Sequence, residues 1–232
     1  VLSSDDAGSA GVTKGEVKLL LADGSVVTNN VNLLASANKF ADTKGLGSTE
    51  AKERAMAAKL DNNGMANTLV TYVIGEDKTI TIGDPTTVSK QFYNIAAGSK
   101  YAAPTQPVQR STASYTFTPV AKAPAGNVTV SVNDSTLFFI RNVGGTGYSV
   151  VKGVSKLPTT ALKKADGSAA AVSNVIYTNT SANPNLAKAV FVEADYQGTA
   201  SYLYVTDSYT GTISVSGEQV YTYPVVFEDG TE

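Results

Sequence analysis

A succession of short apolar runs, separated by Gly, Asn, Asp and Pro, constrains the fold of this chain more than any other feature. Residues 79–82 read Thr-Ile-Thr-Ile, and residues 128–132 read Val-Thr-Val-Ser-Val. Because successive side chains of a strand point to opposite faces, this alternation predicts strands with one buried face. Many short strands divided by turn residues indicate an all-β fold of two small β-sandwich or barrel-like domains, rather than repeated strand–helix–strand units.

Two hairpins are predicted near the start of the chain. Asp23 and Gly24 lie between two apolar runs, residues 16–21 and 25–28. An Asp-Gly pair in this setting predicts a hairpin in which both central turn residues have positive φ. Residues 75–78 form a second predicted hairpin loop, between a later pair of apolar runs.

Residues 48–60 form the one predicted helix, which belongs to the first domain. Ser48 or Thr49 can cap its first turn, where acidic residues also favour a helix N-terminus. Residues 62–64 read Asn-Asn-Gly and end the helix, because these residues tolerate the left-handed conformation that follows a helix.

The predicted domain organisation follows the composition of the chain. Residues 1–11 are rich in Ser, Asp, Gly and Ala and are predicted to be a linker. Residues 12–88 form an N-terminal β domain, residues 89–110 a Pro- and Gly-containing connection, and residues 111–216 a second β domain. Residues 217–232 are predicted to form a terminal strand. They either start a further repeat, since they end like the first hairpin in an apolar strand followed by Asp-Gly, or fold back on a neighbouring strand.

The chain of 232 residues contains no histidine, cysteine or tryptophan. It therefore lacks the side chain that titrates near neutral pH and the side chain that supplies thiolate nucleophiles and disulfides. A net charge of −2 argues against nucleic-acid binding, and no apolar run is long enough to span a membrane. We expect a protein that binds or assembles and is not an enzyme.

Calcium binding was considered at Asp61 and the three residues that follow it, which begin like a calcium loop. Met65 stands where the third oxygen ligand belongs, and no acidic residue closes the loop. A helix C-terminus accounts for these residues better. We therefore expect no cofactor; no motif supports calcium, although backbone carbonyls of neighbouring loops could still hold it.

Glu193 and Asp195 are the carboxylate pair with the spacing to share a strand face, as a glycosidase pair would require. The Gly that follows shortly after them favours a solvated strand end instead. No catalytic residues are therefore assigned.

Tyrosines near the end of the chain form the candidate binding or interface cluster. These are Tyr202, Tyr204, Tyr209, Tyr221 and Tyr223. Pairs two residues apart on a strand share a face, and an exposed aromatic stripe can stack on sugar rings or form a protein interface. The simpler interpretation, which we favour, is that they are cross-strand packing partners.

The order of the predicted strands in the second half of the chain is similar to that of a known family. The segments concerned are residues 137–140, 148–154, 175–177, 187–192, 202–207 and 221–230. Their sequence pattern resembles the β-rich regions of surface proteins that carry S-layer homology domains in Gram-positive bacteria. The helical S-layer homology module itself and a sortase motif do not occur in these residues. The resemblance implies an exported, wall-associated chain at the cell surface, with no catalytic residues to carry over.

The sequence thus predicts a structural segment of an exported bacterial surface-layer or cell-wall-associated protein. Its expected partners are further copies of itself or neighbouring surface proteins, with a cell-wall or host glycan as a further partner. Sheet edges that pair readily make lateral assembly the expected mode of action. The alternatives are a carbohydrate- or host-binding adhesin module and a pilin or filament subunit that assembles by strand exchange.

Overall fold

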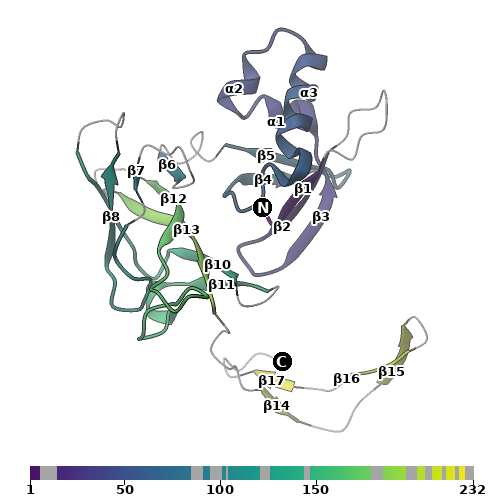
Figure 1. Ribbon diagram of the computed structural model, residues 1–232. Helices are drawn as coiled ribbons and strands as arrows, with labels where there is room; N and C mark the ends of the chain where they lie inside the picture. Colours follow the sequence, from purple (N-terminus) through teal and green to yellow (C-terminus); the bar gives the residue numbers. More distant parts are fainter. Residues whose placement is uncertain are drawn as a thin grey trace. The chain divides into compact units, whose positions relative to one another are not determined.

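The computed structural model describes most of the chain. The described residues are 1–5, 15–84, 91–94, 101–102, 104–120, 126–143, 147–178, 185–196, 203–206, 211–215, 218–222 and 225–227. They divide into two compact units, Val1–Tyr196 and Gln197–Glu232. The structure is mostly β, as the sequence predicted (Figure 1). No helix within these ranges is long and apolar enough to cross a membrane.

The beginning of the first unit combines short strands with helices. Its strands are β1 (Ser3–Asp5), β2 (Glu16–Leu20), β3 (Val26–Asn30), β4 (Thr71–Ile74) and β5 (Ile80–Gly83). β1, β2 and β3 form an antiparallel sheet in that order, and β4 pairs with β5. The predicted alternation is confirmed at β5, where Ile80 and Ile82 are fully buried in a core shared with the sheet and helices.

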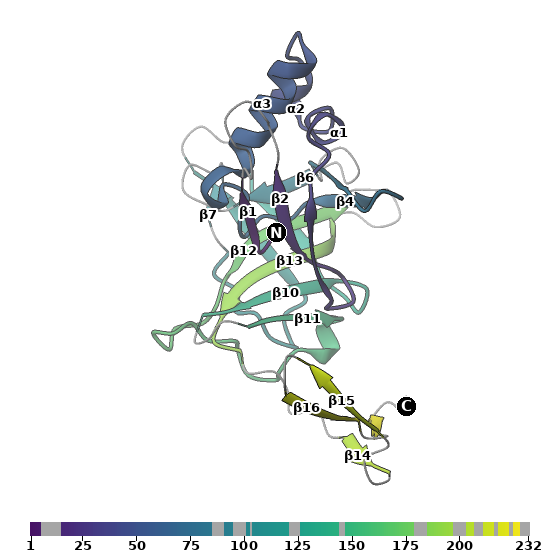
Figure 2. The same ribbon diagram turned by 90° about the vertical axis from the view of Figure 1, so that its right-hand side faces the viewer.

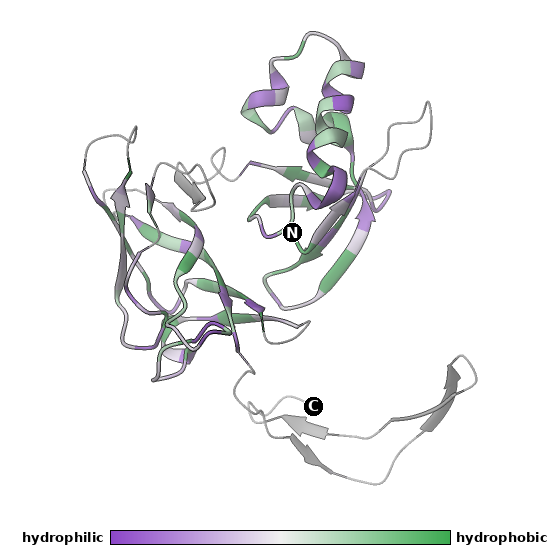
Figure 3. Ribbon diagram, viewed as in Figure 1, coloured by the Kyte–Doolittle hydropathy of each residue, from purple (hydrophilic) through white to green (hydrophobic). Residues whose placement is uncertain are grey.

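Three α-helices lie between β3 and β4: α1 (Leu33–Ala37), α2 (Ala41–Lys44) and α3 (Thr49–Leu60). The predicted helix is confirmed as α3, and Ser48 Oγ accepts a hydrogen bond from the Ala51 amide at 3.1 Å. The prediction of a single helix was wrong in number, because α1 and α2 have one turn or little more and offer almost no periodicity. Figure 3 shows hydrophilic and hydrophobic segments alternating along these helices.

The Asp23-Gly24 hairpin is confirmed, but its predicted turn geometry was wrong. Only Gly24 has positive φ, at 87°. The loop is closed by Leu21 N donating to Ser25 O, and Asp23 Oδ1 accepts from both the amide and the hydroxyl of Ser25, at 2.9 and 2.6 Å. When the Asp side chain accepts hydrogen bonds from the residue two positions later, the Asp itself keeps a negative φ. Only the residue that follows it, here Gly24, then adopts the left-handed conformation.

The same loop recurs twice in the described chain. Asp77 accepts from Thr79, and Asp166 accepts from Ser168, each through one carboxylate oxygen. The residues in the left-handed position are Lys78, with φ of 63°, and Gly167, with φ of 80°. The chain therefore builds three tight hairpins from one local device, an acidic side chain that accepts from a hydroxyl residue two positions later.

The remainder of the first unit is one large sheet. Its strands are β6 (Gln91–Asn94), β7 (Tyr101–Ala102), β8 (Ser114–Pro119), β9 (Val128–Ser131), β10 (Leu137–Asn142), β11 (Tyr148–Lys152), β12 (Val172–Thr178) and β13 (Leu186–Ala194). β13 pairs antiparallel with β12 and parallel with β10, and Figure 2 shows β12, β13, β10 and β11 as successive ribbons. β6 and β7 lie within residues 89–110, the stretch predicted to be a connection, and both pair with this sheet.

Alternate residues of this sheet are buried on opposite faces. Phe138, Val190 and Val175 belong to one core, which also includes Tyr115, Phe117 and Leu157. Their neighbours in the chain, including Phe191 and Ile176, are also buried, at 7% and 8% exposure. β12 and β13 are buried on both faces over most of their length, which explains the nearly continuous apolar runs at residues 175–177 and 189–192.

The second unit contains four described strands in two pairs. These strands are β14 (Leu203–Val205), β15 (Gly211–Val215), β16 (Glu218–Thr222) and β17 (Val225–Phe227). β14 pairs with β17, and β15 pairs with β16, both antiparallel. Residues 218–222 and 225–227 thus enter two different two-stranded pairs.

Lys78→Gly should stabilise the protein by about 0.5 kcal/mol. The left-handed conformation costs an L-residue about 1–2 kcal/mol, of which the greater freedom of glycine in the unfolded chain cancels part. Urea unfolding measures the change. Glu76→Gly in the same loop is the matched control; Glu76 has no positive φ, so glycine there should lower stability. A loss of stability in the Lys78 variant would contradict the turn assignment.

Tyr115→Phe should raise the free energy of unfolding by about 1 kcal/mol. Tyr115 is fully buried, and its hydroxyl has no hydrogen-bond partner among the described residues. An unsatisfied buried hydroxyl costs about 1–3 kcal/mol, and the same burial raises the pKa of Tyr115. Tyr72→Phe, at a side chain that is 40% exposed, is the control and should be near neutral. Destabilisation by Tyr115→Phe would show that the hydroxyl has a partner after all.

Candidate functional site

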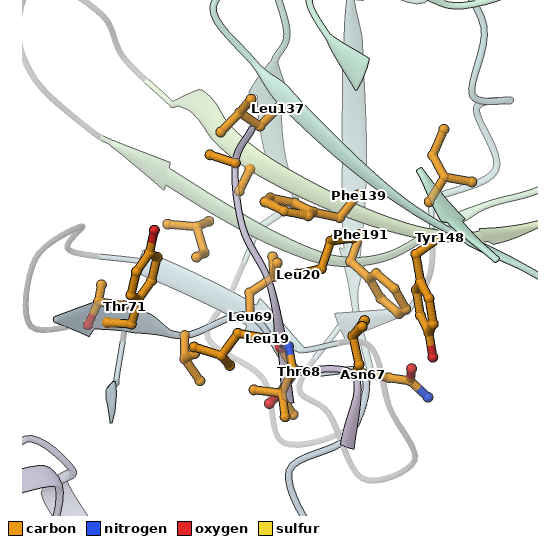
Figure 4. Close-up of a pocket in the computed structure, with 18 residues that line it drawn as sticks. Leu19, Leu20, Asn67, Thr68, Leu69, Thr71, Leu137, Phe139, Tyr148 and Phe191 are labelled. Carbon is orange, nitrogen blue, oxygen red and sulfur yellow. Dashed lines mark hydrogen bonds between the residues drawn. The ribbon is translucent and has the colours of Figure 1, made fainter. Parts of the chain in front are cut away.

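An open groove of about 350 Å³ lies in the first unit, between the large sheet and the N-terminal strands (Figure 4). The sheet lines it with Leu137, Phe139, Ile140, Tyr148, Ile176, Ala189 and Phe191. The N-terminal side lines it with Val1, Leu2, Leu19, Leu20, Ala22 and residues 67–72. We call this feature the apolar groove, because most of these side chains are aliphatic or aromatic.

The register of the strands determines which residues of the sheet lie at the base of the groove. Phe139 of β10 is opposite Phe191 of β13, and Phe191 is opposite Asn174 of β12. These three residues therefore form a row across neighbouring strands. In Figure 4, Phe139, Phe191 and Tyr148 extend toward the side chains of the N-terminal strands.

A β-bulge sets which residue of β12 lies opposite Phe191. The pairing of β12 with β13 shifts between Val172 and Asn174, so Ser173 is the extra residue. Val172 and Val175 both belong to the buried core, although three positions separate them, and Asn174 lies between them, opposite Phe191. A bulge commonly re-aims a side chain in this way.

The apolar groove is lined by apolar side chains and by uncharged polar ones. The polar side chains are amides and hydroxyls, from Asn67, Thr68, Thr71, Tyr72 and Tyr148. No acidic or basic side chain is among the described residues that line it. The aliphatic and aromatic side chains make the groove suited to holding apolar groups.

A second hollow, which we call the polar cleft, adjoins the groove and has a volume of about 760 Å³. It shares Asn67, Thr68 and Phe191 with the groove. Its other lining residues are Ala66, Val143, Lys164, Ala165, Asp166, Ala171, Val172, Ser173, Asn174 and Glu193. Charged and amide side chains therefore gather here, directly beside the apolar surface.

The carboxylates near the cleft have structural partners. Arg141 Nη1 donates to Glu193 Oε1 at 2.7 Å across neighbouring strands. Asp166 holds the hairpin turn that ends at Ser168. Of the carboxylate pair considered in the sequence, Glu193 lines the cleft and Asp195 does not.

Strand β4, beside the groove, has exposed apolar side chains on both of its faces. Tyr72, Val73 and Ile74 are 40%, 66% and 42% exposed. β5 is the one strand that pairs with β4 among the described residues. An exposed apolar strand with one unpaired side is a template for the addition of another strand.

The predicted tyrosine cluster falls largely outside the described residues. Tyr202, Tyr209 and Tyr223 are not described. Tyr204 lies in β14, opposite Val226, and Tyr221 lies in β16, opposite Thr212. The binding role considered for these tyrosines stays a prediction.

The residues after α3 serve the fold. Positive φ falls on Asn62 and Asn63, at 51° and 60°, rather than on Gly64. Asn63 Oδ1 accepts a hydrogen bond from the amide of Ser4 at 3.2 Å and so ties this turn to β1. In the part of the chain that the structure describes, no three His, Cys, Asp or Glu side chains come together as a metal site.

Sequence reasoning missed the residues that line the two hollows. Phe191 and Tyr148 were recognised as strand residues, but nothing in the local pattern shows which faces of two distant strands meet. Asn174 carries a detectable signal, because it is the amide within an otherwise buried apolar strand. A polar residue in such a position is retained only where it is satisfied or used.

Comparison with known proteins found no matching family model, no similar curated protein and no similar solved structure.

The three hairpin aspartates should make stability depend on acidic pH. Hydrogen bonds, first from the hydroxyl and then from the amide of the residue two positions later, lower the pKa of Asp23, Asp77 and Asp166. A lowered folded-state pKa stabilises the fold above the unfolded-state value of about 3.9, and this contribution is lost as pH falls through the folded-state value.

Changing all three aspartates to Asn should therefore flatten the fall in urea midpoint between about pH 5 and about pH 2.5. The Asn side-chain oxygen can still accept the same hydrogen bonds but does not titrate. The wild-type chain, measured over the same pH range, is the reference. An unchanged slope in the triple variant would show that other groups cause the acid dependence.

Proposed function

We propose that this chain is a structural segment of an exported bacterial surface-layer or cell-wall-associated protein, acting by assembly rather than by catalysis. The proposal includes two β-sandwich or barrel-like domains and an extracellular location. The observation that carries it is the set of exposed apolar side chains on β4, which lies beside the apolar groove. The resemblance to the β-rich regions of S-layer homology proteins supports the same conclusion.

The partner we propose for β4 is a second copy of this chain. Main-chain hydrogen bonds from an added strand would pair its unpaired side, and the side chains of that strand would flank Tyr72 and Ile74 on one face and Val73 on the other. Thr71 and Tyr72 also line the groove, so the two apolar surfaces are continuous.

The charge of the chain is compatible with close packing of copies. Charged residues make up 16% of the sequence, and the net charge is −2. Repulsion between copies is therefore weak, whereas a strongly charged chain would oppose assembly.

A second candidate function, a glycan-binding adhesin module, is favoured by the polar cleft. Its side chains are suited to a hydroxyl-rich ligand. A wall-associated structural segment and a glycan-binding module are compatible roles of one chain. Assembly by strand exchange, as in a filament subunit, is the variant of the proposal in which the added strand comes from a terminal segment.

Electron microscopy of the purified chain over a range of concentrations tests assembly directly. We expect ordered lattices, sheets or fibres, formed with and without added calcium chloride. A chain that stays monomeric at every concentration would contradict the proposal. So would reproducible turnover of a substrate by the chain.

Val73→Lys should raise the concentration needed for assembly by at least about tenfold. Lysine on an edge strand opposes pairing, and a tenfold change corresponds to about 1.4 kcal/mol per contact. Val120→Lys is the matched control, because Val120 is also exposed, at 40%, but lies outside β4 and the groove. Equal assembly by the two variants would exclude β4 as the contact.

A further inference from the structure

The register of β4 shows which of its backbone groups are open to a partner. Successive residues of an antiparallel strand direct their amide and carbonyl groups alternately to one neighbour and to the other. Gly75, which directly follows β4, donates its amide to Thr79 O at 2.9 Å, so its backbone groups face β5. By alternation Val73 also faces β5, whereas Tyr72 and Ile74 direct their backbone groups to the other side. No strand in the described part of the chain pairs with that side.

Hydrogen bonds on the far side of β5 support this assignment independently. Ile80 lies opposite Ile74, and its carbonyl accepts from the amide of the residue before α1 at 2.9 Å. Ile82 lies opposite Tyr72, and its amide donates to a serine hydroxyl of α1 at 3.1 Å. Both residues of β5 therefore direct these groups away from β4, which is the arrangement of non-hydrogen-bonded pairs.

The open groups of β4 are complementary to those of an identical strand under a two-fold axis. With the axis beside Val73, Tyr72 of one copy lies opposite Ile74 of the second copy, and the second copy's Tyr72 lies opposite Ile74 of the first. Each of these pairs exchanges two N–H···O bonds, so every open amide and carbonyl of the two residues is satisfied. The two Val73 residues then form a non-hydrogen-bonded pair on the other face of the joined sheet.

The side chains of β4 also suit contact with an identical strand. No residue of β4 is charged, so no charge of the strand faces its own copy. Like charges directly opposite each other destabilise a strand pair, and edge strands that avoid pairing commonly carry lysine or proline. An aromatic side chain opposite a β-branched one, as for Tyr72 and Ile74, is a favourable cross-strand pair.

We propose that two copies of this chain join through β4 about a two-fold axis at Val73, which makes one antiparallel sheet in the order β5-β4-β4-β5. The inference rests on the proposed function, since it specifies the contact between copies at β4. A two-fold contact occupies the same edge on both copies and is closed. The β4 contact therefore gives a dimer, and growth into a lattice or fibre requires a second, different contact.

Cysteine crosslinking of the full chain tests this contact, because the chain has no cysteine of its own. Cα atoms of a non-hydrogen-bonded pair are about 4.5 Å apart, within the range that a disulfide spans. Val73→Cys should therefore give a disulfide-linked dimer with glutathione disulfide as the oxidant, as measured on denaturing gels without reductant. Val120→Cys, also at an exposed position but outside β4, is the control for random collision. Crosslinking of the Val73 variant no greater than that of the control would overturn the proposal.

Two further variants test the alignment of the strands. Tyr72→Cys alone should give at least tenfold less dimer than Val73→Cys, because the two copies of residue 72 are diagonal neighbours about 7–8 Å apart. A mixture of Tyr72→Cys and Ile74→Cys chains should crosslink between the two different variants, which intact mass distinguishes. Preferential crosslinking of Tyr72→Cys to itself would overturn the axis at Val73.

Crosslinking and electron microscopy over the same concentrations separate this inference from the proposed function. Crosslinked dimers that never form larger assemblies would support the two-fold contact and contradict the proposed lattice. Assemblies that form without crosslinking at Val73 would overturn the two-fold contact alone. A chain that neither crosslinks nor assembles would overturn both.

Discussion

Main-chain pairing between strands is the interaction on which the rest of this structure depends. The chain has no cysteine and therefore no disulfide to hold its elements together. β13 pairs with β10 and β12 along most of its length and joins β9 at one position, so it organises the large sheet. Because most residues of β13 are buried, most of its backbone groups are satisfied by the neighbouring strands. The stability of the first unit follows from that pairing, from the core of this sheet and from the separate core of the N-terminal strands and helices.

Buried side-chain hydroxyl groups also supply hydrogen bonds to backbone groups outside the strand pairs. Ser4 Oγ donates to the Leu60 carbonyl and accepts from the Met65 amide, which joins β1 to the end of α3. Ser36 Oγ accepts from the Ile82 amide, and Thr136 donates to the Ala187 carbonyl. These residues are buried, and each forms a hydrogen bond with a backbone group that is not satisfied by strand pairing. Among the described residues, the open side of β4, the amide oxygen of Asn174 and the hydroxyl of Tyr115 remain without a partner.

The parts of the fold with strong local signals could be predicted from the sequence. The alternation of residues 79–82 predicted the buried Ile80 and Ile82, and Ser48 marked the start of α3. The turn at Asp23 was placed correctly but given the wrong geometry, because the side-chain hydrogen bond from Ser25 decides it. The candidate site could not be predicted. Residues 139, 174 and 191 lie side by side because of the register of their strands and a β-bulge. Both depend on long-range packing and produce no periodic pattern in the sequence. The short helices α1 and α2 could not be predicted either, because they are too brief to show a helical period in the sequence.

The account's central claim is that β4 is completed by a second copy of the chain, and hydrogen exchange tests this most directly. Exchange of the β4 amides, from Thr71 to Ile74, would be followed by mass spectrometry at low and at high protein concentration. Pairing with another copy predicts that these amides become protected as the concentration rises, while the amides of β13 stay equally protected throughout. Exchange at β4 that does not depend on concentration, in samples where copies are shown to associate, would contradict the account.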